Sequence, residues 1–127
     1  MNNFTKEYIE LCKSEKVQGL KKKYYQGDWI IPKDKKMMVN IFDGIERLDY
    51  LWLPTGDQLD DEIVKIIEEE ARQSDYELKL SYNVEYEDAE YFTEILYPDG
   101  VIRVPSQCNH NPLIAKIQLL IKLLEEK

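Results

Sequence analysis

The 127 residues of this chain, 43% hydrophobic and 33% charged, are typical of one globular domain around a single core and exclude a disordered chain. The formal net charge is −8, although residues 1–36 contain nine lysines against five acidic residues, and the acidic remainder argues against strong non-specific DNA binding. No apolar run approaches the roughly 20 residues that span a bilayer, and residues 1–10 lack the order of a signal peptide, so we expect a cytoplasmic protein.

Residues 3–14 are predicted to form a short amphipathic helix. Between Phe4 and Cys12, apolar side chains recur at i, i+4, i+7 and i+8, the spacing of one helix face. Asn2 or Asn3 is expected to cap this helix, because asparagine is favoured at that position. The polar, lysine-rich residues that follow are expected to be a connection.

Three strands are predicted in the next part of the chain. Residues 29–31 are strand-like and end at Pro32, which cannot donate to a ladder, and residues 37–42 are predicted to return as the second strand of a hairpin. The apolar run at 50–53 has the pattern of a strand covered on both faces, and it ends at Pro54.

A second helix is predicted to begin after Thr55. Thr55 is followed three residues later by Gln58, which matches a capping box. The apolar positions of this helix share one arc of the helical wheel; they are Leu59, Ile63, Val64, Ile66, Ile67 and Ala71.

Further strands are predicted after this helix. Residues 76–86 alternate between apolar and polar, the pattern of a strand with one buried face. Residues 91–97 and 101–104 flank the turn sequence YPDG, which predicts a hairpin. Residues 106–111 are expected to form a loop.

The last helix is predicted over residues 113–124, with Asn111 as its cap and a proline at its first position. Nine of its twelve residues are apolar, an arc wider than one sheet face needs. Lys116 lies inside that arc, so either its stem runs past its apolar neighbours to water or the helix meets a second surface. In the second case Lys116, Leu120 and Leu123 are the candidate dimer contact.

Together the elements predict an α+β sandwich, in which two main helices pack on a mostly antiparallel sheet and the short N-terminal helix closes an edge. We expect one domain, with the N-terminal helix and a basic connector in residues 1–27 and the core in residues 28–127.

The sequence contains no recognisable catalytic motif. His110 is the only histidine, so a histidine-based site would depend on it alone, and Cys108 lies two residues away on a predicted loop. Cys12 and Cys108 have no zinc-ligand spacing and are expected to be reduced thiols. Asp88 and Glu90 lack the spacing of a calcium loop. We therefore predict no enzyme activity, no cofactor and no metal.

The segment KKKYYQGDW, residues 21–29, is the candidate binding surface. Positive charge interleaved with aromatic rings suits a phosphate backbone and unstacked bases. The candidate contact residues are Lys21, Lys22, Lys23, Tyr24 and Tyr25. The alternatives are a contact with a protein, or a structural role in which Tyr24, Tyr25 and Trp29 enter the core and leave the lysines solvated.

The order of the segments resembles a family of small uncharacterised phage and prophage proteins, including those described as having a phage ABA-sandwich domain. The likeness covers residues 8–124 and rests on GDWI at 27–30, LWLPTGDQL at 51–59 and a closing helix after a cap. It implies that certain positions are signatures of the fold, and it implies no activity. These positions are Trp29, Trp52, Leu53, Pro54, Asp57, Gln58 and Leu59.

The resulting expectation is a non-enzymatic phage or prophage accessory protein that acts through protein contacts, including self-association. The alternative is a nucleic-acid-binding protein that uses residues 21–29. A third expectation, an enzyme that holds a cation with acidic residues, requires carboxylates that converge in a pocket. Inference from a phage context is by association only.

Overall fold

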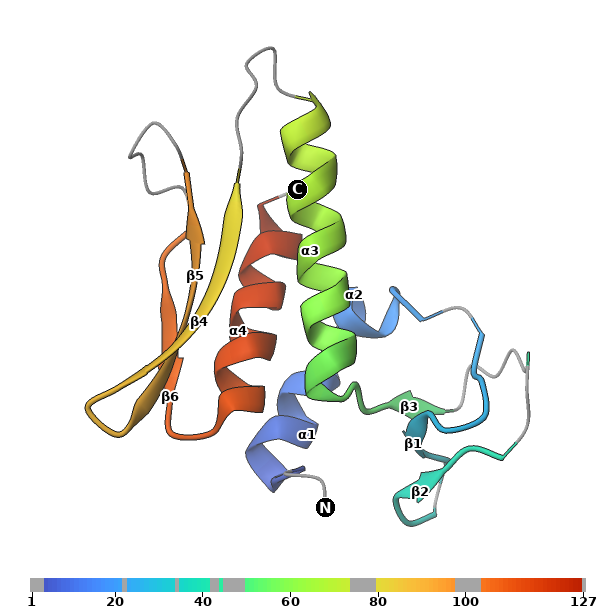
Figure 1. The fold of residues 1–127 in the computed structure, drawn as a ribbon. Helices are drawn as coiled ribbons and strands as arrows, with labels where there is room; N and C mark the ends of the chain where they lie inside the picture. The colour runs from blue at the N-terminus through green and yellow to red at the C-terminus, as the bar shows by residue number, and fades with distance from the viewer. Residues whose placement is uncertain are drawn as a thin grey trace. The chain divides into compact units, whose positions relative to one another are not determined.

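The computed structural model describes residues 4–21, 23–33, 35–41, 44, 50–73, 80–97 and 104–126. Over these residues the chain is α+β, as predicted, with its strands in two antiparallel three-stranded sheets rather than one. The chain divides into two compact units, Met1–Thr55 and Gly56–Lys127 (Figure 1). None of the helices in these ranges is both long and apolar enough to cross a membrane.

In the first unit, two short helices precede the sheet. α1 (Lys6–Cys12) is capped by Thr5, whose hydroxyl accepts a hydrogen bond from Tyr8 N at 3.1 Å. The predicted cap at Asn2 or Asn3 is therefore wrong: threonine supplies the same kind of oxygen nearer to the first turn. α2 (Glu15–Gln18) follows directly and was not predicted.

The first sheet has the order β2-β1-β3, with β1 (Trp29–Ile31) at its centre. β2 (Met38–Val39) pairs with β1, which confirms the predicted hairpin. The strand is shorter than the predicted range of residues 37–42, and residue 42 lies outside the described chain. β3 (Leu51–Trp52) is the third predicted strand, and it pairs with the other side of β1. This sheet places Ile30 and Trp52 in the core.

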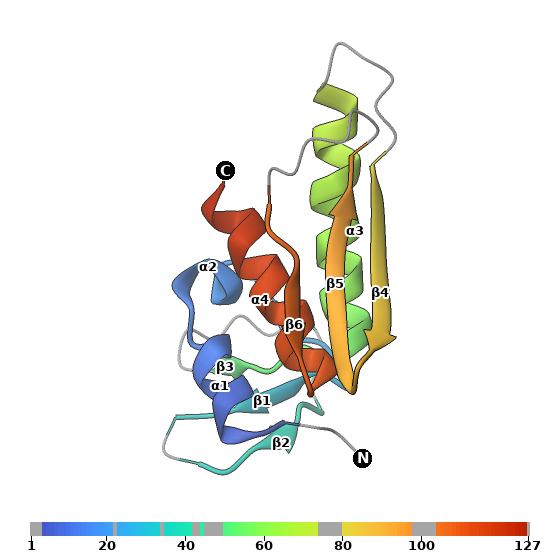
Figure 2. The same cartoon turned by 90° about the vertical axis from the view of Figure 1, so that its left-hand side faces the viewer.

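In the second unit, two helices cover one face of a three-stranded sheet. α3 (Gly56–Gln73) and α4 (Pro112–Glu125) lie side by side (Figure 1), with β4 (Ser81–Glu87), β5 (Glu90–Leu96) and β6 (Gln107–Asn109) in front of them in Figure 2. The order is β4-β5-β6, so β5 is the central strand.

β4 and β5 form a hairpin with a two-residue turn. Asp88 and Ala89 both have positive φ, 53° and 65°, as in the primed turns that match the twist of paired strands. The register places Tyr86 opposite Tyr91, with ring centroids 4.8 Å apart. Of the predicted strand at 76–86, residues 76–79 lie outside the described chain.

The third strand of this sheet corrects a prediction. Of the predicted turn and the return strand at 101–104, residues 98–103 lie outside the described chain, and Val104 is buried but not part of a strand. β6 pairs with β5 and lies inside residues 106–111, which we predicted as a loop. Gln, Cys and Asn have no apolar alternation, and only pairing with a neighbouring backbone makes them a strand.

The two long helices follow their sequence signals closely. Asn111 Oδ1 accepts from Leu113 N at 2.9 Å, which confirms the predicted cap of α4. α3 begins directly after Thr55, as predicted, while the capping-box hydrogen bonds stay a prediction. Val64 was placed on the apolar arc but is 38% exposed, because that arc is wider than the packed face.

Candidate functional site

Lys21, the first residue of the predicted binding segment, is paired inside the first unit. Its Nζ lies 2.9 Å from Asp28 Oδ2, and the two side chains are only 15% and 7% exposed. The same Nζ lies 5.3 and 5.4 Å from the ring centroids of Tyr25 and Trp52, within cation–π range. A lysine held by a carboxylate and two rings does not offer its charge to a phosphate.

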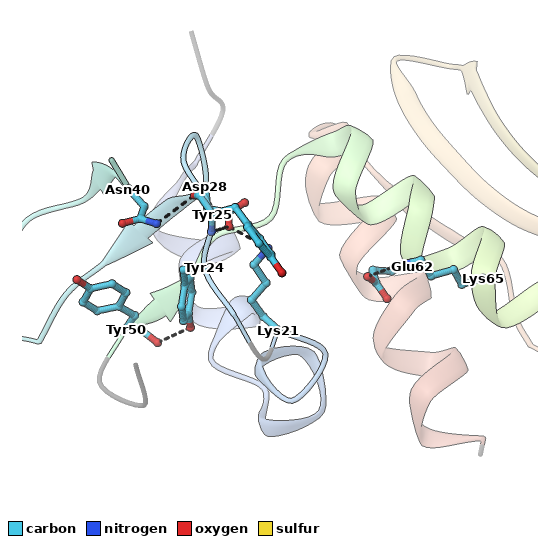
Figure 3. Close-up of polar contacts among 8 residues, drawn as sticks. All are labelled: Lys21, Tyr24, Tyr25, Asp28, Asn40, Tyr50, Glu62 and Lys65. Atoms are coloured by element: carbon cyan, nitrogen blue, oxygen red, sulfur yellow. Dashed lines mark hydrogen bonds and ion pairs between the residues drawn. The ribbon is translucent and has the colours of Figure 1, made fainter. Parts of the chain in front are cut away.

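Asp28 fixes the turn that follows the lysines. Tyr25 N donates to Asp28 Oδ2 at 2.7 Å, and Asn40 Nδ2 donates to Tyr25 O at 3.0 Å (Figure 3). Asn40 N also donates to Asp28 O at 2.7 Å, which continues the pairing of β1 with β2. Asp28 and Asn40 are buried. This polar cluster is therefore a structural support for the sheet.

The remaining residues of the segment divide between core and surface. Tyr24 is buried, and its hydroxyl donates to Tyr50 O at 3.1 Å. Trp29 is half-buried in β1. Tyr25 is 50% exposed and Lys23 is exposed, whereas Lys22 lies outside the described residues. Tyr24 thus has the structural role in the core. Lys23 and Tyr25 lie at the surface, where the predicted binding role still applies to them.

One edge of the first sheet is closed by a side chain. Gln18 Nε2 donates to Trp52 O at 2.9 Å, and Trp52 N donates to Gln18 Oε1 at 2.8 Å. The amide therefore pairs with β3 as a neighbouring strand would, which protects that edge. A second bond from Gln18 Nε2, to Cys12 O at 2.6 Å, orients the amide. Nothing in the local sequence marks Gln18 for this role.

The opposite edge of the same sheet is exposed and apolar. We call residues 35–41, which contain β2, the β2 edge. Four of its apolar side chains are 38%, 44%, 37% and 65% exposed: Met37, Met38, Val39 and Ile41. Lys35 and Lys36 within it and Lys33 beside it are also exposed. An exposed edge strand is a template for pairing with another chain, and methionine adapts to varied partners.

In the second unit, one polar cluster joins α3, α4 and β4. Lys116 Nζ lies 3.1 Å from Asp60 Oδ2, and the Tyr82 hydroxyl donates to Asp60 Oδ1 at 2.8 Å. Burial, then the hydrogen bond to Asp60, raises the pKa of Tyr82 above its ordinary value. Neither of our alternatives for Lys116 describes this arrangement, because the ammonium ends on a partner within its own unit.

The candidate dimer contact finds no support in this arrangement. Lys116 is 16% exposed and paired, and Leu120 and Leu123 are buried at 0% and 3% exposure. These side chains are therefore already covered within the chain. They offer no apolar face to a second copy.

No cation site is evident in the part of the chain that the structure describes, where no three His, Cys, Asp or Glu side chains converge as metal ligands. Cys108 is exposed on β6, and a hydrogen bond with Glu90 raises its pKa. His110 Nδ1 lies 3.5 Å from Ala89 O. Cys12 is buried in α1, and burial raises its pKa to about 12.

The two thiols are expected to react at very different rates. With an aromatic disulfide reagent at pH 8, Cys108 should react in the native protein and Cys12 only after denaturation, because the thiolate is the reactive form and must be accessible. Glu90→Gln should speed the reaction of Cys108 by lowering its pKa. Simultaneous reaction of both thiols would contradict the burial of Cys12.

The sequence matches no protein-family model, and comparisons with curated proteins and with solved structures give no significant match. The resemblance to the phage family therefore stays a prediction. Of its signature positions, Trp52 and Pro54 are buried, and Pro54 O accepts a hydrogen bond from the Tyr8 hydroxyl. Trp29 and Gln58 are half-buried. These positions support the fold and carry no chemistry of their own.

Proposed function

We propose that this chain is a non-enzymatic accessory protein that binds another protein through the β2 edge. One observation carries the proposal: four apolar side chains are exposed in the β2 edge, two of them in the strand itself, while Gln18 closes the other edge of the same sheet. A sheet with one closed edge and one apolar open edge suits the addition of a strand from a partner.

The chemistry of the β2 edge defines the partner. Backbone groups of an added strand would pair with β2, and its apolar side chains would cover Met38 and Val39. Exposed lysines at 33, 35 and 36 favour acidic side chains on that strand. The partner segment is therefore extended, acidic and partly apolar.

The phage or prophage origin and the cytoplasmic location belong to this proposal as well. They rest on the residues quoted for the resemblance and on the composition of the chain. An accessory role through protein contacts is compatible with a chain whose sequence carries no catalytic motif.

A matched pair of valines tests the proposal. Val39 on β2 and Val64 on α3 are 37% and 38% exposed. Peptides selected from a displayed library by the full chain should be rich in alternating acidic and apolar residues. Val39→Lys should weaken their binding at least about tenfold, because it replaces one of the apolar side chains that the added strand would cover, whereas Val64→Lys should leave it unchanged. Peptides without acidic enrichment, or equal effects of the two variants, would contradict the proposal.

Nucleic-acid binding is the second candidate, because Lys23 and the half-exposed Tyr25 remain on the surface. It has less support, since Lys21 is held by Asp28 and the chain is acidic overall. A single-stranded oligonucleotide titrated at low salt into the same variants separates the two candidates. Nucleic-acid binding would be favoured if the oligonucleotide binds Val39→Lys as it binds the wild type but does not bind the double variant Lys23→Gln with Tyr25→Ala.

A further inference from the structure

The second unit also has an exposed edge strand. β4 pairs only with β5 within the described ranges, so it forms one edge of its sheet. It has seven residues, and two of its larger apolar side chains, Val84 and Tyr86, are 40% and 64% exposed. We call residues 81–88 the β4 edge. Its length gives it more backbone groups to pair than β2 has.

The β4 edge is acidic where the β2 edge is basic. Glu85, Glu87 and Asp88 are exposed along it, and residues 81–88 contain no lysine or arginine. Residues 33–41 contain three lysines, Lys33, Lys35 and Lys36, against one acidic residue, Asp34, so this part of the sequence is positive on balance. The two edges therefore carry opposite charges and exposed apolar side chains.

We propose that the partner of the β2 edge is the β4 edge of a second copy of this chain. This inference rests on the proposed function of the β2 edge and names its occupant. The β4 edge is an extended, acidic and partly apolar strand, which is the chemistry that the β2 edge selects. Pairing would join the first sheet of one copy to the second sheet of the next.

Charge selects this pairing over the symmetric ones. Two β2 edges would place lysines beside lysines, and two β4 edges would place Glu85 and Glu87 beside each other, which is unfavourable. Charged residues on an edge are a recognised protection against pairing. An edge of opposite charge removes that protection and leaves the backbone and apolar groups free to pair.

Unlike edges on one chain produce head-to-tail association. Each copy has one β2 edge and one β4 edge, so a dimer joined by one such contact still has one of each at its ends and can add further copies. The attraction involves exposed charges and falls with ionic strength, since the Debye length is about 8 Å at physiological salt. Self-association should therefore be strongest in low salt.

Three valines of nearly equal exposure test the inference: Val39 on β2, Val84 on β4 and Val64 on α3, at 37%, 40% and 38%. Sedimentation velocity of the full chain at increasing concentration in low salt should show dimers and longer species for the wild type and Val64→Lys. Val39→Lys and Val84→Lys should each associate at least about tenfold more weakly, because each has lost an apolar contact on one of the two edges.

An equimolar mixture of Val39→Lys and Val84→Lys gives the decisive result. The first variant keeps an intact β4 edge and the second an intact β2 edge, so the mixture should form dimers that do not grow further. A variant that failed to fold could not restore association in this way. Two double variants reverse the charge of one edge each: Lys35→Glu with Lys36→Glu, and Glu85→Lys with Glu87→Lys. Each double variant should associate poorly alone, and the two should associate well when they are mixed.

Three results would overturn the inference. One is a wild type that stays monomeric in low salt at every concentration; if it still binds acidic peptides through Val39, the proposed function stands without it. A second is self-association of Val84→Lys with none of Val39→Lys, which indicates a symmetric contact of β2 edges. The third is a mixture of the two variants that remains monomeric.

Discussion

Trp52→Ala is expected to destabilise the fold of the first unit by about 3–5 kcal/mol, the usual cost of truncating a core aromatic residue. The side chain is 2% exposed, and Lys21 Nζ lies over its ring. The backbone of Trp52 pairs with β1 on one side and with the Gln18 amide on the other. Truncation therefore leaves a cavity at the point where the helices and the sheet of this unit meet.

Fluorescence can follow this change specifically. Trp29 and Trp52 are the only tryptophans in the sequence, and both lie in the first unit. In Trp52→Ala, the fluorescence of Trp29 therefore reports on the unfolding of the first unit. Denaturant titration should show a lower midpoint than the wild type. Trp52→Phe is the control: it keeps an aromatic ring and leaves a smaller cavity, so it should cost less than Trp52→Ala. An unchanged midpoint for Trp52→Ala would contradict the packing.

The best sequence predictions were those with a local physical cause. The Asn111 cap and the proline after it fix where α4 begins, and the apolar arc of α3 selects the face that it buries. The hairpin of β1 and β2 follows from two strand-like runs separated by a charged turn. Each signal lies within a few residues of the structure that it specifies.

The features that were missed depend on contacts between distant residues. Gln18 and Trp52 are 34 positions apart, and no local pattern shows that a polar side chain will close a sheet edge. β6 is a strand only because β5 pairs with it. The division of the strands into two sheets follows from pairing partners, which alternation along the chain does not reveal.

The binding role of residues 21–29 stays a prediction. Charge and aromatic residues do gather at residues 21–29, yet Asp28 within the same segment takes up the charge of Lys21. The β2 edge was missed as a surface, because residues 37–42 are mostly apolar and were interpreted as an ordinary strand. Exposure of an edge depends on what covers it, and sequence alone does not show that.

Asp60→Ala is expected to destabilise the second unit by about 2–3 kcal/mol. The substitution removes the partner of Lys116, which is 16% exposed, and the acceptor of the Tyr82 hydroxyl. Leaving a buried charge unpaired costs about 3–5 kcal/mol, but the Asp60 side chain is 32% exposed, so water partly replaces it and the cost is lower. Amide hydrogen exchange in β4 and in the adjoining helices should become faster by the factor that this loss of stability implies.

Lys116→Met is the matched control, because it removes the other charge of the pair and keeps an unbranched chain of similar volume. Asp60 then stays solvated through its exposed third and keeps its bond from Tyr82, so the loss should be smaller than for Asp60→Ala. The double variant leaves no unpaired lysine. Its loss of stability should therefore be smaller than the sum of the losses in the two single variants. Strictly additive effects would mean that Lys116 does not depend on Asp60, and the polar cluster would then not be what joins α3, α4 and β4.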